Sequence, residues 1–198
     1  MVTILKEFQN EDQVIYKFVL IQGLKSVEIF NSQELIKKLT SINSKYDVTI
    51  QICSASLIVT WEHIFLSVLH AILAFNQKRN ISNQLELEIL LYISSQRQIK
   101  IALEDFGIKT GNNVIIIVGN STDQIKQALV ECENLLEGVR SDEVIGICDN
   151  SKLLAIREYF QISDEELNAI ALTDIEDSQE DAVLKAVLNR IALVTLEK

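Results

Sequence analysis

The sequence predicts an α+β fold, in which a helix-rich single domain spans residues 1–198 and holds a small mixed or antiparallel sheet. Short β-branched segments, Val14–Leu20 and Val48–Cys53, are typical of strands. Longer segments repeat apolar residues at helical spacing. The two kinds of segment do not alternate regularly, as they would around a parallel sheet. With 198 residues, 48% of them hydrophobic, the chain has enough apolar surface for one core.

Two helices are predicted in the first half of the chain. Residues 32–42 place Leu35, Ile36 and Leu39 on one helix face, which we expect to be buried. The segment Trp61–Asn76 is apolar nearly all round. A helix of this kind belongs inside a protein, so we expect it at the centre of the fold.

A pair of helices is predicted next. The first should begin at a Ser82 N-cap and end near Ile93. The second should run from about Gln96 to Phe106 and stop at Gly107. Its expected buried stripe consists of Ile99, Ala102, Leu103 and Phe106.

The remaining elements follow from apolar runs and helix caps. Val114–Val118 and Val144–Cys148 are predicted strands. Between them, Ser121 should cap a helix that closes at Gly138. The last two helices should begin at serine caps, Ser163 and Ser178.

The net charge and the cysteines limit which partners the protein can bind and in which compartment it is expected. The formal net charge is −10, and the whole acidic excess lies after residue 130, which disfavours non-specific DNA binding. The three cysteines lack the spacing of a disulfide framework or a zinc site. The N-terminus has no apolar leader, and the most apolar window carries Glu62, His63 and His70. We therefore expect a cytoplasmic protein without a membrane span, metal or cofactor.

No catalytic constellation is apparent in the sequence. Glycine-rich nucleotide motifs and the G-x-S-x-G motif are absent. The turn Gly119–Thr122 after a strand has backbone amides for an anion, but an ordinary N-cap explains it better. His63 and His70 are seven residues apart, too far along one helix to share a metal, and are expected as polar members of a buried helix.

Basic residues around the predicted helical pair form the best candidate for a binding site. Lys78 and Arg79 end the long helix, while Arg97 and Lys100 are placed on the helix face opposite the Ile99/Leu103 stripe. With Tyr92 nearby, they are typical of a small pocket for single-stranded nucleotides. The alternative is ordinary surface charge, with Lys100 pairing with a glutamate at i+4.

Two sequence blocks carry a resemblance to a known family. The segment from Trp61 to Gly119 contains HAILAF, EILLYISSQRQI and ALEDFGI, and the chain closes with VLNRIALVTLEK. It resembles the small regulatory subunit of the KEOPS complex, the family of the kinase-binding protein of the human PRPK kinase. Residues 88–108 are the most specific part of the likeness, and residues 138–178 are the least family-like.

This resemblance implies a non-catalytic subunit of the complex that adds threonylcarbamoyl to a tRNA adenosine. Such a subunit binds the small atypical kinase/ATPase and recruits tRNA through its single-stranded 3′ CCA end. We expect Arg97 to contact RNA, because it lies in the most family-specific block and its planar guanidinium can pair with a phosphate or stack on a base; Lys78, Arg79, Lys100 and Tyr92 are expected around it. Two alternatives remain: a protein–protein adaptor without RNA binding, and a small-molecule enzyme that uses the Gly119–Thr122 turn.

The kinase is expected to bind through an apolar surface on the last helix. This helix has more apolar residues than one buried stripe requires, namely Val187, Leu188, Ile191 and Leu193. The alternative is that all four residues belong to the core, because terminal helices commonly dock onto their own domain.

Overall fold

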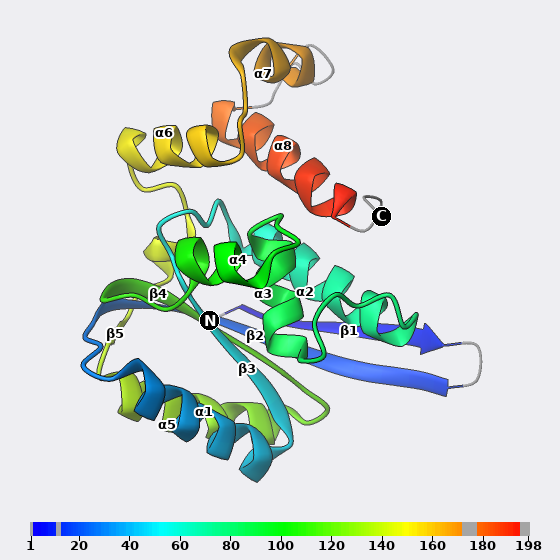
Figure 1. Ribbon diagram of the computed structural model, residues 1–198, viewed down its shortest axis with the longest axis vertical. Helices are drawn as coiled ribbons and strands as arrows, with labels where there is room; N and C mark the ends of the chain where they lie inside the picture. The colour runs from blue at the N-terminus through cyan, green and yellow to red at the C-terminus, as the bar shows by residue number, and fades with distance from the viewer. Residues whose placement is uncertain (1, 11–12, 172–177, 195–198) are drawn as a thin grey trace. The chain divides into compact units, whose positions relative to one another are not determined.

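The computed structural model describes residues 2–10, 13–171 and 178–194, and these ranges form eight α-helices and five β-strands (Figure 1). All paired strands are antiparallel, which confirms the predicted α+β class and one of the two expected sheet types. The chain divides into two compact units, Met1–Ser54 with Gly107–Val144, and Ala55–Phe106 with Ile145–Lys198. That both units belong to one domain stays a prediction.

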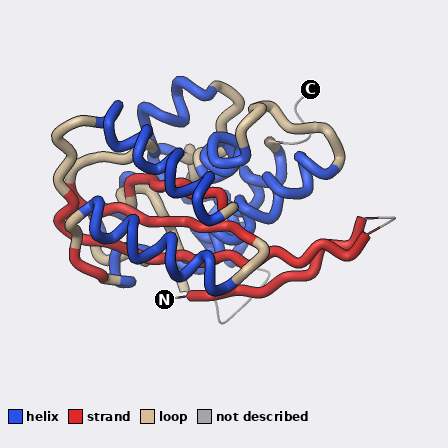
Figure 2. Tube along the Cα trace, turned by 90° about the horizontal axis from the view of Figure 1, so that it is seen from below, coloured by secondary structure: helices blue, strands red, loops and turns tan. Residues whose placement is uncertain are grey.

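The first unit is built around the sheet. Its elements are β1 (Val2–Asn10), β2 (Gln13–Val27), α1 (Ser32–Tyr46), β3 (Val48–Ser54), β4 (Gly111–Gly119), α5 (Thr122–Leu136) and β5 (Val139–Arg140). The strand order is β1-β2-β4-β3, and the short β5 pairs with β2. From β2 onward this is the split β-α-β-β-α-β arrangement. The β1–β2 hairpin extends past the end of the sheet (Figure 2).

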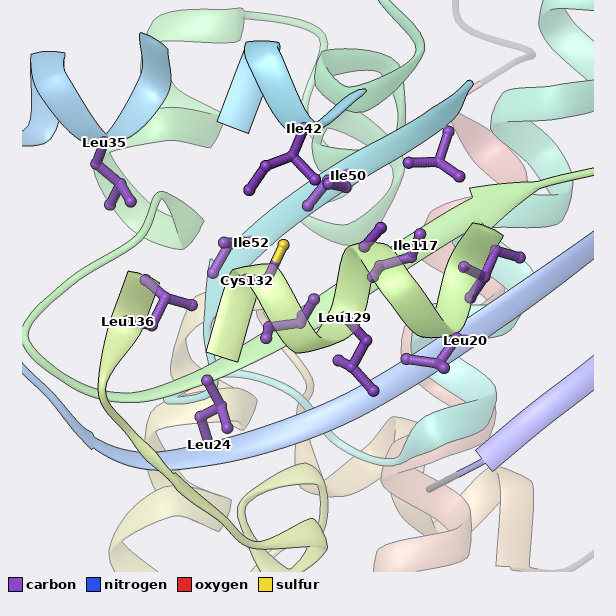
Figure 3. Close-up of a cluster of buried hydrophobic side chains, with 14 of the residues drawn as sticks. Leu20, Leu24, Leu35, Ile42, Ile50, Ile52, Ile117, Leu129, Cys132 and Leu136 are labelled. Carbon is purple, nitrogen blue, oxygen red and sulfur yellow. The ribbon is translucent and has the colours of Figure 1, made fainter. Parts of the chain in front are cut away.

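The core of this unit lies between one face of the sheet and the helices α1 and α5 (Figure 3). Leu35 and Ile42 of α1 and Leu129 of α5 are buried against alternate residues of the strands. The expectation that Ile36 shares this face is wrong, because its side chain is 59% exposed. Each residue turns a helix by about 100°, so Ile36 is rotated away from the stripe of Leu35 and Ile42.

The second unit is helical. Its elements are α2 (Trp61–Asn76), α3 (Leu85–Ile93), α4 (Ile99–Phe106), α6 (Asn150–Tyr159), α7 (Asp164–Ala171) and α8 (Gln179–Leu193). Helix α2 packs against both α3 and α8, and it buries Ile64 and Ile72 while Leu69 is half-buried. Its predicted bounds and the burial of Ile64 and Ile72 are confirmed, whereas its place at the centre of one whole fold stays a prediction.

Two boundaries in the helical pair differ from prediction. Helix α3 begins at Leu85, because the buried Glu88 carboxylate accepts the N–H groups of Ile81 and Ser82 and holds that segment outside the helix. Helix α4 begins at Ile99 and buries Ala102 and Phe106. Leu103, expected in the buried stripe, is 46% exposed.

The predicted strand over residues 144–148 is wrong. A 3₁₀ turn occupies Asp142–Ile145 instead. The Asp142 carboxylate accepts hydrogen bonds from the Gln22 side chain and the Gly23 N–H, at 2.9 and 3.5 Å, where a longer β5 would have continued along β2. The serine caps, by contrast, are confirmed at residues 121, 163 and 178.

Within the described ranges, no helix combines the length and apolar character that crossing a bilayer requires.

Candidate functional site

A pocket of about 350 Å³ opens in the helical unit, and several polar side chains line it. It lies where three helices end. Its walls come from the turn after α3, the end of α6 and the end of α8. The lining residues are Ser94, Ser95, Gln96, Tyr159, Phe160, Gln161, Arg190, Leu193 and Val194. We call it the α3–α6–α8 pocket.

Aromatic packing and a hydrogen bond join two walls of this pocket. The Tyr159 hydroxyl donates to the Ser94 carbonyl at 3.1 Å. The Tyr159 ring packs edge-on against Phe106 and Phe160, at centroid distances of 5.3 and 4.9 Å. Burial raises the pKa of Tyr159 to about 12, so its hydroxyl stays protonated and remains a donor at neutral pH.

His63 of α2 supports the same region from within the core. Its Nε2 is 2.9 Å from the Ile93 carbonyl, and its Nδ1 accepts the Val59 N–H at 3.3 Å. Its ring meets the edge of Phe160 at 5.8 Å. Burial lowers the pKa of His63 to about 4, so the imidazole is neutral and Nε2 carries the proton. This confirms the prediction of a polar residue in a buried helix.

Two arginines stand at the end of α8. The Arg97 guanidinium donates to the Val194 carbonyl at 2.6 Å. Arg190 binds the Glu166 carboxylate through both terminal nitrogens, at 2.7 and 2.6 Å, which raises the pKa of Arg190 and lowers that of Glu166. Arg190 is thus already paired, while Arg97 uses one nitrogen and is otherwise exposed.

The structure does not gather the four predicted basic residues into one pocket. Lys78 and Arg79 precede α3 and are exposed, whereas Arg97 and Lys100 follow it. With nine residues, α3 is ~13 Å long, so it separates the two pairs. Arg97 lies in the turn before α4 rather than on its face, and Lys100 lies 3.8 Å from Glu104 at i+4.

Tyr92 is not available as a stacking platform. Only 1% of its surface is exposed, and its ring stacks on His70 at 5.6 Å inside the helical unit. The aromatic residues of the pocket are Tyr159 and Phe160 instead. Sequence reasoning missed these two residues because more than 60 residues separate them from Arg97, and no local sequence pattern shows that they line the same pocket as Ser94–Gln96.

The predicted apolar surface on the last helix is largely core. Val187 and Ile191 are fully buried, and Leu188 is half-buried. Leu193 is 45% exposed but lines the α3–α6–α8 pocket. The reason is that α8 docks against α2 and α7, so its apolar stripe faces inward.

A more continuous apolar surface lies on α2. Four residues at i, i+4 spacing form what we call the α2 outer face: Trp61, Phe65, Leu69 and Leu73. Trp61 and Leu73 are each 37% exposed, the other two are half-buried, and the rings of Trp61 and Phe65 are 6.3 Å apart. A large apolar stripe that keeps contact with solvent is typical of a protein-binding surface.

The other candidate sites give no support for catalysis. The Gly119–Thr122 turn caps α5, and the Ser121 hydroxyl accepts the Gln124 N–H, as in an ordinary N-cap. No cluster of three histidine, cysteine or acidic residues suited to a metal ion occurs in the part of the chain that the structure describes.

Comparisons with known proteins agree with the resemblance found in the sequence. The family model for the kinase binding protein CGI-121 matches residues 26–195. A curated relative, regulatory protein Cgi121 from Methanocaldococcus jannaschii, is 28% identical over 180 residues, which cover 91% of this chain and 99% of the relative. The chain therefore belongs to the CGI-121 family of kinase-binding proteins.

Proposed function

We propose that this chain is the non-catalytic, kinase-binding regulatory subunit of a cytoplasmic KEOPS complex, and that it holds the single-stranded 3′ CCA end of tRNA. Membership in a kinase-binding family supports the regulatory role. The observation that carries the RNA role is the α3–α6–α8 pocket, because Ser94, Ser95 and Gln96 in its wall directly precede Arg97 in the most family-like block.

The chemistry of the pocket suits an unpaired nucleotide. Tyr159 and Leu193 provide surfaces against which a base can pack, and Gln96 and Gln161 provide amide groups for its edge. Arg97 has further donors for a phosphate beside the base. Because the chain carries a net charge of −10, this attraction acts only at short range, so affinity should be modest and salt-sensitive.

A titration with two RNAs tests the RNA role. Intact tRNA should bind more tightly than the same tRNA trimmed of its CCA end, and Arg97→Glu should remove most of that difference. Lys37→Glu is the matched control, because it makes the same charge change on an exposed residue of α1 in the other unit. Thermal unfolding of both variants checks the fold. Equal affinity for the two RNAs would refute the RNA role and favour the adaptor without RNA binding.

For the kinase, we propose the α2 outer face as the contact surface in place of the last helix. Leu73→Glu puts a charge into this apolar stripe and should weaken binding of the cognate kinase by more than tenfold. Leu154→Glu is the control, because Leu154 is an exposed leucine on α6, 54% accessible and outside the stripe. Equal kinase binding by both variants, measured by calorimetry, would contradict this placement.

A further inference from the structure

Two nucleophilic side chains stand together at the start of α6, at the opposite end of this helix from the α3–α6–α8 pocket. Cys148 is exposed and directly precedes the Asp149 N-cap, and Lys152 follows in the first turn of the helix. The Asp149 carboxylate joins them. Its Oδ1 accepts the Lys152 backbone N–H at 2.8 Å, and its Oδ2 accepts the Cys148 thiol at 3.4 Å. A thiol and an amine are therefore held within one helical turn.

The Lys152 side chain folds back over the segment that carries the cysteine. Its Nζ donates to the Gly146 carbonyl at 2.7 Å, two residues before Cys148, and the residue is half-buried. Burial lowers the pKa of Lys152 from 10.5 to about 8, and the nearby negative charges of Cys148 and Asp149 oppose this shift. Part of Lys152 is therefore a neutral amine near neutral pH. Donating one N–H to Gly146 leaves the nitrogen lone pair available for attack.

We propose that Cys148 and Lys152 form an acylation site, at which the thiol takes an acyl group from a small thioester and passes it to the amine. In the first step, the Cys148 sulfur attacks the thioester carbonyl carbon, the C–S bond of the donor breaks, and the donor leaves as a free thiol with the proton from Cys148. In the second step, the Lys152 nitrogen attacks the same carbon, the C–S bond to Cys148 breaks, and the amine proton returns to the sulfur. The product is an amide on Lys152, and neither step needs an oxidant or a reductant.

The two residues divide the work according to their exposure. Cys148 is exposed and can meet a thioester in solution, whereas Cys53 and Cys132 are buried and cannot. The half-buried amine of Lys152 is less accessible to a bulky donor. An acyl group on Cys148 lies within the same turn as this amine, so the second step is intramolecular and its rate does not depend on the donor concentration.

The test incubates the full-length protein with acetyl-coenzyme A at mildly alkaline pH. Mass spectrometry of proteolytic peptides follows the acetylation of each lysine, after neutral hydroxylamine has removed acetyl groups from sulfur. We expect the Lys152 amine to be acetylated about tenfold faster than that of Lys37, an exposed lysine of α1. A rate at Lys152 no higher than the rate at Lys37 would overturn the proposal.

Two variants test the transfer itself. Cys148→Ser removes the thiol at an exposed position and should lower the acetylation rate of Lys152 to that of Lys37, with Lys37 unaffected. An unchanged rate at Lys152 would mean that the amine reacts directly with the donor, and it would overturn the transfer. Lys152→Arg removes the acyl acceptor, so an acetyl group that hydroxylamine can remove should accumulate on Cys148. Its absence would overturn the first step. Thermal unfolding of both variants checks that the fold is retained.

Discussion

His63 should make the stability of this protein depend on pH in the weakly acidic range. Burial lowers the pKa of its imidazole to about 4 in the folded chain, against about 6.5 when unfolded. Below pH 6.5 the imidazole is protonated in the unfolded chain but stays neutral in the folded chain. The free energy of unfolding therefore falls as the pH falls toward 4. The slope is about 1.4 kcal/mol per pH unit, and the loss between pH 7 and 4.5 is about 2 kcal/mol.

The measurement is urea unfolding at intervals from pH 7 to 4.5 for the natural protein and for His63→Gln. Glutamine does not titrate and can still offer an acceptor and a donor to the Val59 N–H and the Ile93 carbonyl. Surface carboxylates affect both proteins equally, so the difference between the two curves isolates His63. Parallel curves over the whole range would refute the reasoning, because they would mean that the buried imidazole takes up its proton without cost.

Three other changes have definite expected outcomes. Glu88→Ala should lower the free energy of unfolding in urea by about 3–6 kcal/mol, because two N–H groups lose a charged acceptor. Gly23→Ala should lower the thermal midpoint, because its Cβ would stand 2.2 Å from a backbone carbonyl oxygen; an unchanged midpoint would contradict the close approach. The exposed Cys148 should react with maleimide in the native protein. Cys53 and Cys132 are buried, and burial raises the pKa of each thiol to about 12, so they should be labelled only after unfolding. Mass spectrometry of the labelled protein distinguishes the two cases.

Local patterns in the sequence predicted most of the elements. Helix α2 has the predicted bounds, because an unbroken apolar run over four turns leaves few alternatives. The capping serines at 121 and 178 mark the starts of α5 and α8, because a hydroxyl that accepts an amide three residues later acts within one turn. Family membership was also evident, because the EILLYISSQRQI block is contiguous in the chain.

Which side chains are buried depended on tertiary packing. Periodicity placed Leu103 inside and left Tyr92 free to stack on a nucleotide, yet Leu103 is exposed and Tyr92 lies under His70. An apolar stripe in the sequence predicts that one face of a helix is buried. Which residues at the edges of that face lose contact with solvent depends on the neighbouring helices. The same holds for Val187 and Ile191, which α8 buries against its neighbours.

The candidate site itself was beyond the reach of sequence reasoning. By itself, the sequence determined the described helices except α6, most of the strands and the family, because each of these depends on neighbours along the chain. Only the tertiary structure brought Tyr159 and Val194 beside Ser94, across 65 and 100 residues of sequence. The side chains of Arg97 and Tyr159 donate to backbone carbonyl groups, at Val194 and Ser94, and every residue has such a carbonyl, so the residue type at the accepting position does not reveal the contact.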